Sequence, residues 1–150
     1  MPSLLGLDIG TTNIKAMVYD SAKGQVVAQA SLPTPVSHPQ SDWTEFDPLA
    51  VWQTTSACIR RAVGTLPASQ DIQAVAVASM GEAGVPLDEN GDPLYRIIAW
   101  HDPRTEPQAE WLRQTVGAEA MHRITGQQVR HIFGATKILW LKEHVPAVFQ

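Results

Sequence analysis

Three short β-rich runs at residues 4–9, 14–20 and 25–32 constrain the fold of this chain more than any other feature. Gly10-Thr11-Thr12-Asn13 separates the first two runs, and Ser21-Ala22-Lys23-Gly24 separates the last two. Connections this short, with glycine or asparagine in them, join neighbouring antiparallel strands. The sequence therefore predicts a three-stranded antiparallel meander.

A helix and a further strand are expected after the meander. Asp47-Pro48 has the pattern of a helix N-cap followed by proline at the first helical position. The apolar positions that predict the buried face of this helix are Leu49, Trp52, Ile59 and Val63. The run 72–78 is apolar almost throughout, which is typical of a strand that is buried on both faces and paired in parallel. The order β-β-β-α-β predicts an α/β, ribonuclease-H-like layered domain.

The second half of the chain contains turn and helix signals. Residues 89–92, Glu-Asn-Gly-Asp, predict a hairpin turn, and 97–100 predict another strand. From Arg104 onward the pattern is helical, with breaks at Gly117 and Gly126. The last apolar stripe comprises Ile138, Leu141 and Val145, and Pro146 ends it.

Composition narrows the class of protein. The chain has 150 residues, 44% of them hydrophobic and 17% charged, as in a soluble globular domain. The net charge of −4 comes without a basic stripe, which argues against a nucleic-acid partner. No apolar stretch reaches the roughly 18 residues of a membrane span, and the N-terminus lacks a signal-peptide pattern. The single cysteine, Cys58, excludes an internal disulfide and is expected to be a buried, inert thiol. We expect a cytoplasmic protein without a membrane partner.

The turn between the first two strands has the residues of a phosphate-binding site. Gly10 lets a phosphate approach the backbone, and the turn 10–13 can direct backbone N–H groups at an anion. Thr11, Thr12 and Lys15 add hydroxyl donors and a cation. Asp8 would repel phosphate directly, so its expected role is to hold Mg²⁺ through water. The alternative is a plain hairpin, in which glycine and asparagine serve only the turn.

Five ordered motifs together resemble the N-terminal part of the FGGY family of carbohydrate kinases, in the actin/Hsp70/sugar-kinase superfamily. The resemblance extends over essentially all 150 residues and favours the xylulokinase and gluconokinase branch. The motifs are Leu7-Asp8-Ile9-Gly10-Thr11-Thr12, the "W-x-E-x-D-P" pattern at 43–48, the "L-x-x-x-I-x-W-x-D-x-R" pattern at 94–104, Ile124-Thr125-Gly126, and Thr136-Lys137-Ile138-Leu139-Trp140-Leu141.

The resemblance implies an ATP-dependent kinase that phosphorylates a sugar or polyol hydroxyl, with ATP and Mg²⁺ as cofactors. In this hypothesis Asp8 holds Mg²⁺ through water, and the β/γ-phosphates are bound by the 10–13 turn (Gly10, Thr11, Thr12 and Asn13) and Lys15. The family's general base, an aspartate, is expected beyond residue 150, so no catalytic residue is assigned within the chain. Residues 1–150 are expected to be the N-terminal portion of the first domain of a two-domain kinase. We expect this incomplete domain to be inactive alone, with exposed surface that favours a homodimer.

The substrate is less defined than the family. Met80-Gly81-Glu82-Ala83 stands where xylulokinases carry "Q-M-H-G". Glu82 resembles the glutamate of glycerol kinases, whereas Gly81 stands where those enzymes have arginine. His101 stands where xylulokinases have asparagine. The choice among hexose, pentose and polyol is therefore open.

Polar residues after two predicted strands form the expected sugar-binding face. Ligands of open α/β sheets bind at strand ends. The expected substrate-binding residues, which follow such ends, are Gly81, Glu82, Trp100, His101 and Asp102. Glu82, His101 and Asp102 can pair with sugar hydroxyls, and Trp100 offers a flat apolar surface.

Each of these assignments has an alternative. Trp100 can equally be a core residue, and Asp102 can cap the helix that begins near Pro103. Arg104 is expected to brace the loop or pair with an acid, and Trp111 and Trp140 are expected in the core. A metal role for His101 is disfavoured, because no second His or Cys has ligand spacing.

Two other functions remain open from the sequence. An actin- or Hsp70-like nucleotide-binding module would use the phosphate turn but leave Glu82 and residues 100–102 unexplained. A non-catalytic interaction domain would account for the short length.

Overall fold

The computed structural model describes residues 3–68 and 70–150, which divide into two compact units. The first unit contains the described residues up to Val36 together with Asp47–Met80. The second contains Ser37–Phe46 together with Gly81–Gln150. Each unit has its own secondary structure and its own packing.

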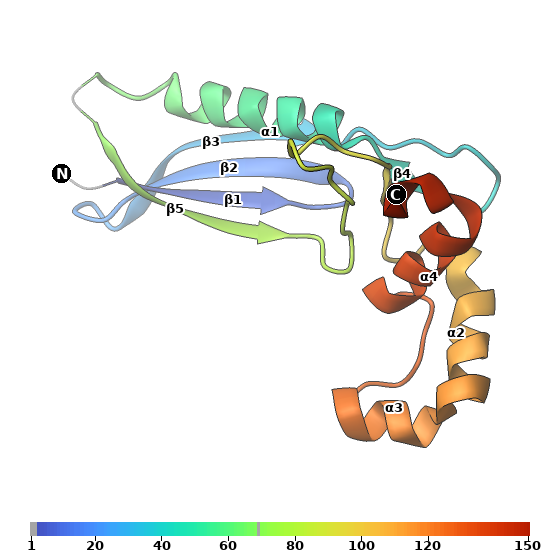
Figure 1. The fold of residues 1–150 in the computed structure, drawn as a ribbon. Coiled ribbons are helices and arrows are strands. Elements are labelled where there is room, and N and C mark those ends of the chain that lie inside the picture. The colour runs from blue at the N-terminus through green and yellow to red at the C-terminus, as the bar shows by residue number, and fades with distance from the viewer. Residues whose placement is uncertain (1–2, 69) are drawn as a thin grey trace. The chain divides into compact units, whose positions relative to one another are not determined.

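The first unit is built on a four-stranded sheet (Figure 1). Its strands are β1 (Ser3–Ile9), β2 (Asn13–Asp20), β3 (Gln25–Pro33) and β5 (Ile72–Ser79), in the order β3-β2-β1-β5. β1, β2 and β3 pair antiparallel, which confirms the predicted meander. β5 pairs parallel to β1, as the apolar run 72–78 predicted.

One face of this sheet is covered by helix α1 (Pro48–Val63), which packs on β2 and β3 (Figure 1). Side chains alternate across a strand, and this alternation buries Leu5, Leu7, Ile14, Ala16 and Val18. The helix begins as predicted, because the Asp47 side chain accepts hydrogen bonds from the backbone N–H groups of Leu49 and Ala50.

The buried face of α1 differs from the predicted one. Leu49 is 59% and Trp52 65% exposed, and Ile59 and Val63 are only partly buried. The buried positions are Val51, Thr55, Cys58 and Ala62. Most of these are small residues, which let the helix backbone lie close to the sheet. The prediction failed because it ranked positions by hydrophobicity, whereas close packing on a sheet selects by size as well.

Cys58 confirms the expectation of a buried thiol. It has no exposed surface, and its Sγ donates to the carbonyl oxygens of Ile14 and Ala30. The thiol therefore links α1 to β2 and β3.

Burial of β5 on both faces is not found. Val75 is 56% and Val77 60% exposed. Within the described residues β5 is an edge strand next to β1, whereas α1 packs on β2 and β3 and does not cover β5. The apolar composition of the strand predicted its pairing but not its burial in this chain.

The second unit is mainly helical. A two-stranded antiparallel sheet pairs β4 (Glu45–Phe46) with β6 (Ile97–Ile98). A 3₁₀ turn at Pro103–Thr105 leads into α2 (Glu106–Leu112), and a π-helical turn at Arg113–Gly117 leads into α3 (Ala118–Thr125). Helix α4 (Gly134–His144) and a 3₁₀ turn at Pro146–Phe149 complete the chain.

Several local predictions for this unit are confirmed. Gly117 and Gly126 break the helical run with φ angles of 92° and 71°, a region that suits glycine. A tight turn at 88–92 closes with Gly91 at φ 86° and a single Leu87–Pro93 bridge. The predicted strand 97–100, however, is two residues long and belongs to the separate small sheet.

The core of the second unit centres on Ile98, Trp140 and Leu141. Trp140 is in the core as predicted, whereas Trp111 is 50% and Ile138 57% exposed. Among the helices formed by the described residues, none combines the length and apolar character that a bilayer crossing requires.

Candidate functional site

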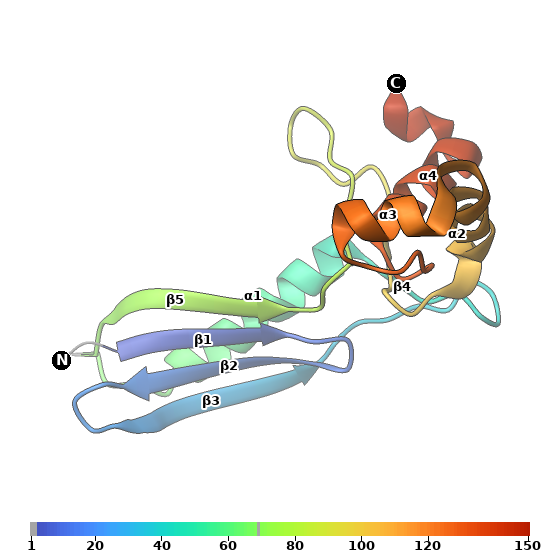
Figure 2. The same ribbon diagram turned by 90° about the horizontal axis from the view of Figure 1, so that it is seen from below.

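The predicted phosphate turn lies at the ends of β1 and β2. Asp8 and Lys15 are cross-strand partners, and both are exposed. Directly opposed residues of an antiparallel pair project from the same face. That face is the one that α1 does not cover, and it is turned toward the viewer in Figure 2. An acceptor that suits a cation and a donor that suits a phosphate therefore emerge together.

Gly10 lies at a close approach of two backbone segments inside this turn. Its N–H donates to the Asn13 carbonyl oxygen at 3.1 Å and closes the turn. A Cβ at Gly10 would lie 3.0 Å from that oxygen and 3.9 Å from Asp8 Oδ1. A side chain there would push the backbone apart, so the turn requires glycine at this position. Because the Gly10 N–H is used inside the turn, it is not offered to a ligand.

Thr34, at the end of β3, fixes the turn and was missed by the sequence analysis. Its Oγ1 donates to the Gly10 carbonyl oxygen at 2.7 Å, and its N–H donates to the Thr12 carbonyl oxygen at 3.0 Å. Thr34 is only 5% exposed. The threonine stands 24 residues from the turn, so no local pattern linked the two.

The residues of the turn fit Mg²⁺ bound together with a polyphosphate. Within residues 3–68 and 70–150, no group of three or more His, Cys, Asp or Glu side chains could hold a metal ion by itself. Magnesium does not need such a cage, because it retains several waters and is held by one or two carboxylates together with substrate phosphates. The exposed Asp8 at the end of β1, next to the turn, fits that requirement. A shallow cavity of about 490 Å³ lies along β2 and β3, lined by Lys15, Met17, Gln29, Ala30 and Ser31.

In the second unit, Glu82 has an unusual backbone conformation. Its φ is 53°, and within the described residues it is the only residue other than glycine with a positive φ. This left-handed conformation costs an L-residue about 1–2 kcal/mol and is concentrated at functional sites. Glu82 is exposed, and its Oε2 accepts a hydrogen bond from the backbone N–H of Gly134 at 2.5 Å.

Lys137 contacts the same residue and was given no role by the sequence analysis. Its Nζ donates to the Glu82 carbonyl oxygen and, at 3.3 Å, to the Ile132 carbonyl oxygen. The residue is 5% exposed, and burial lowers the pKa of its ammonium group, an effect that the charges of Glu82 and Asp102 oppose. The signal available in the sequence was a lysine among the apolar residues of the motif at 136–141.

Trp100, His101 and Gly81 are exposed. Trp100 is 45% exposed, so the alternative that it is a core residue is wrong. Its ring meets the His101 ring edge-on, with centroids 5.2 Å apart. No atom lies within 4 Å of a Cβ built at Gly81, so this position borders open space.

Asp102 is different, because its carboxylate is fully occupied by the protein. It has no exposed surface. Oδ1 accepts from Arg104 N and Nε, and Oδ2 accepts from Thr44 N and Arg104 Nη2, at 2.6–3.0 Å. The capping role is therefore confirmed, and the geometry gives no support to the prediction that Asp102 accepts a substrate hydroxyl.

Burial alone would raise the pKa of Asp102, but hydrogen bonds from Arg104 and Thr44 outweigh it and hold the pKa below 3.8. Arg104 braces the loop, as expected. It also donates to Glu45 Oε1 at 2.6 Å, and its guanidinium lies 3.8 Å from the centre of the Trp43 ring.

Two cavities lie within the second unit. One, of about 400 Å³, is lined mainly by residues of the segment 127–138, with Glu82 and Leu112.

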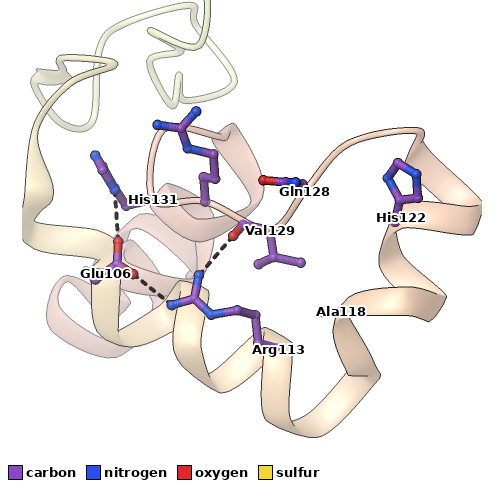
Figure 3. A pocket seen from close by; sticks show the side chains of 8 residues that line it. Glu106, Arg113, Ala118, His122, Gln128, Val129 and His131 are labelled. Carbon is purple, nitrogen blue, oxygen red and sulfur yellow. Dashed lines mark hydrogen bonds and ion pairs between the residues drawn. The ribbon is translucent and has the colours of Figure 1, made fainter.

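The other, of about 590 Å³, is shown in Figure 3. There Glu106 pairs with Arg113 at 2.7 Å and His131 at 2.9 Å, and Arg113 also donates to the Val129 carbonyl oxygen. The hydrogen bond from Arg113 is the main cause that lowers the pKa of Glu106. The ion pair with Glu106 and the hydrogen bond from Arg113 hold His131 and Val129 against α2 and the turn that follows it.

Comparison with known proteins identifies the family. Residues 3–150 match the model of the FGGY family of carbohydrate kinases, N-terminal domain. The chain belongs to this family. A glycerol kinase from Acidovorax sp. (strain JS42) is 36% identical over 148 residues, which are 97% of this chain and 30% of that protein.

Solved structures of this family of carbohydrate kinases have the same fold. The xylulose kinase from Rhodospirillum rubrum superposes with a TM-score of 0.92 at 34% identity, over 98% of this chain and 30% of that one. The glycerol kinase of Plasmodium falciparum with ADP gives 0.93 at 25% identity, over 100% and 30% of the two chains. The predicted α/β, ribonuclease-H-like fold is confirmed. The chain spans about 30% of the length of these relatives.

Proposed function

We propose that this chain forms part of an ATP-dependent kinase that phosphorylates a primary hydroxyl of a sugar or polyol. One observation carries the proposal. The family match runs over residues 3–150, and within it the exposed side chains of Asp8 and Lys15 emerge as cross-strand partners beside the turn at residues 10–13. Relatives named as glycerol and xylulose kinases support a small polyhydroxylated substrate.

We assign the nucleotide phosphates to the first unit. Bound Mg·ATP supplies the γ-phosphoryl group for transfer. Asp8 holds the metal through water, while the Thr11 and Thr12 hydroxyls, the turn to Asn13 and the Lys15 ammonium group contact phosphate oxygens. Catalysis of this kind depends chiefly on positioning and charge neutralisation.

We assign one face of the sugar site to exposed residues of the second unit. Glu82 accepts a hydroxyl hydrogen bond, Trp100 packs against C–H groups, and His101 pairs with a further hydroxyl. The open space at Gly81 leaves room for substrate. Asp102 holds the loop through Arg104 instead of contacting the sugar.

We further propose that residues 1–150 are the N-terminal portion of the kinase's first domain. The relatives are about three times longer, which supports this assignment. The general base that takes the hydroxyl proton is then supplied by the remaining length, as the family resemblance implies.

The test is a kinase assay on the protein in its full natural length. With Mg·ATP, a panel of glycerol, D-xylulose and D-gluconate should reveal ADP formation that depends on one member. Asp8→Asn should lower kcat by about a hundredfold or more, the scale of losing one charge-stabilising group. Asp92→Asn, in the exposed turn at 88–92, is the matched control and should leave kcat unchanged.

ATP hydrolysis at the same rate with and without every compound of the panel would contradict the proposal. That result would instead favour a nucleotide-binding module of the actin/Hsp70 kind.

A further inference from the structure

The strained conformation of Glu82 needs an external cause. A φ of 53° is unfavourable for a residue with a Cβ, and such conformations persist only where the surroundings impose them. Glu82 follows β5 in a loop that has little regular hydrogen bonding of its own. The restraint must therefore come from outside this loop.

Helix α4 makes two contacts with Glu82, one with its backbone and one with its side-chain carboxylate. Lys137, in its first turn, donates from Nζ to the backbone carbonyl oxygen of Glu82. Gly134, at its first position, donates its backbone N–H to Oε2 of the Glu82 side chain. The backbone and the carboxylate of Glu82 are thus held by one rigid element.

The contact with Gly134 is close enough to depend on the missing side chain. A Cβ at Gly134 would lie 3.3 Å from Glu82 Oε2, which is tight for a carbon–oxygen contact. An alanine there would displace the carboxylate, because a flexible side chain yields before the helix backbone does.

The second carboxylate oxygen is left for a ligand. Within the described part of the chain, Oε1 of Glu82 has no hydrogen-bond donor, and the residue is exposed. One oxygen is therefore fixed at the end of α4, and the other is presented in a defined direction.

We propose that Lys137 and Gly134 are positioning residues for Glu82. Lys137 holds the left-handed backbone, Gly134 orients the carboxylate, and together they aim Oε1 at a hydroxyl of the substrate. This inference rests on the proposed function, in which Glu82 accepts that hydrogen bond.

A purely structural role for Lys137 would give a different result from a positioning role. If Lys137 only stabilised α4, its loss would lower the melting temperature and affect both substrates alike. If it positions Glu82, its loss raises KM for the sugar while KM for ATP stays unchanged. The two KM values therefore separate the roles.

The first experiment replaces the ammonium group in the full-length protein. Lys137→Met keeps the length and burial of the side chain but removes the donor. It should raise KM for the active member of the glycerol, D-xylulose and D-gluconate panel about tenfold, the scale of losing a hydrogen bond to a charged group. Lys142→Met, an exposed lysine of the same helix, is the control and should leave both KM values unchanged.

The second experiment does not weaken the fold. Gly134→Ala replaces glycine by a better helix former, so the melting temperature should stay level or rise. KM for the sugar should nevertheless increase several-fold, because the added Cβ displaces Oε2. Lys142→Met, which lies outside the cavity lined by Glu82, is again the control and should leave KM for the sugar unchanged. If Lys137→Met fails to fold, Gly134→Ala alone decides the inference.

Glu82→Gln separates failure of this inference from failure of the proposed function. An unchanged kcat/KM in Glu82→Gln would remove Glu82 from the sugar site and contradict the proposed function there. If Glu82→Gln raises KM but Gly134→Ala leaves KM for the sugar at its original value, the positioning inference is overturned while the sugar site stands.

Discussion

At the scale of single residues, buried charge determines how the loop 100–105 is built. Arg104 is 7% exposed and Asp102 fully buried, and the two are joined by three hydrogen bonds. Glu45 adds a second carboxylate to the same guanidinium. A buried pair of this kind contributes little by itself, but removal of one partner leaves an uncompensated charge. The loop that bears the exposed Trp100 and His101 is therefore held in place by the buried ion pairs of Arg104.

Asp102→Asn tests this arrangement through stability. The variant leaves Arg104 with one carboxylate partner instead of two, so the free energy of unfolding should fall by about 3–5 kcal/mol. Urea unfolding at pH 7 measures the change. A loss below 1 kcal/mol would show that Glu45 alone satisfies Arg104.

The pH dependence of the same variant has a defined sign. Because the folded-state pKa of Asp102 lies below 3.8, its carboxylate contributes stability that is complete above about pH 4 and is lost as the pH falls through the folded-state pKa. Asp102→Asn lacks this contribution. Its unfolding free energy should therefore decline less than that of the wild type as the pH is lowered below about 4.

At the scale of elements, the phosphate turn depends on a strand that is not part of it. The hairpin of β1 and β2 forms the turn, but the end of β3 holds it through Thr34. The alternative of a plain hairpin does not require such a tether. The tether holds the backbone of the turn in one conformation, which lowers the conformational entropy lost when a phosphate binds.

Thr34→Val tests the tether. It removes the hydroxyl while it keeps the shape of the side chain, and the partly buried carbonyl oxygen of Gly10 loses a donor. The free energy of unfolding should fall by about 1 kcal/mol, and KM for ATP should rise several-fold while KM for the sugar stays unchanged. Kinetics of the full-length protein and urea unfolding measure these effects.

Thr65→Val is the matched control for this prediction. Thr65 also donates its hydroxyl to a backbone carbonyl oxygen, that of Ala62 at the end of α1. Its loss should cost similar stability without a change in KM for ATP. Equal effects of the two variants on KM for ATP would contradict a specific role for Thr34.

At the scale of the whole molecule, we expect these 150 residues to provide parts of a site but not a catalytic centre. The first unit carries the proposed phosphate turn and the second carries one proposed sugar face. Phosphoryl transfer requires donor, acceptor and base together in a site that excludes water. The chain matches about 30% of the length of its relatives, and the resemblance assigns the base to the remainder.

We therefore expect residues 1–150 alone to phosphorylate no sugar or polyol. A coupled ADP assay with Mg·ATP and the same panel of substrates measures this on the purified chain, and the full-length protein is the positive control. Sugar-dependent turnover by the chain that disappears in Asp8→Asn would contradict the expectation. It would mean that a base lies within these residues.

The sequence by itself determined the local structure of this protein. The meander, the N-cap at Asp47 and the breaks at Gly117 and Gly126 follow from turn chemistry and side-chain periodicity. These features depend on residues only a few positions apart, so a linear pattern contains them. The five motifs likewise predicted the family, which the match over residues 3–150 confirmed.

Only the tertiary structure decided which faces are buried and which distant residues meet. Close packing selected Val51, Thr55, Cys58 and Ala62 as the buried face of α1 and left the more hydrophobic Leu49 and Trp52 exposed. Asp102 proved to be enclosed by Arg104 and Thr44, and Glu82 proved to be held by Lys137 from 55 positions away. Such contacts depend on how elements pack in three dimensions, and residue spacing along the chain does not encode that.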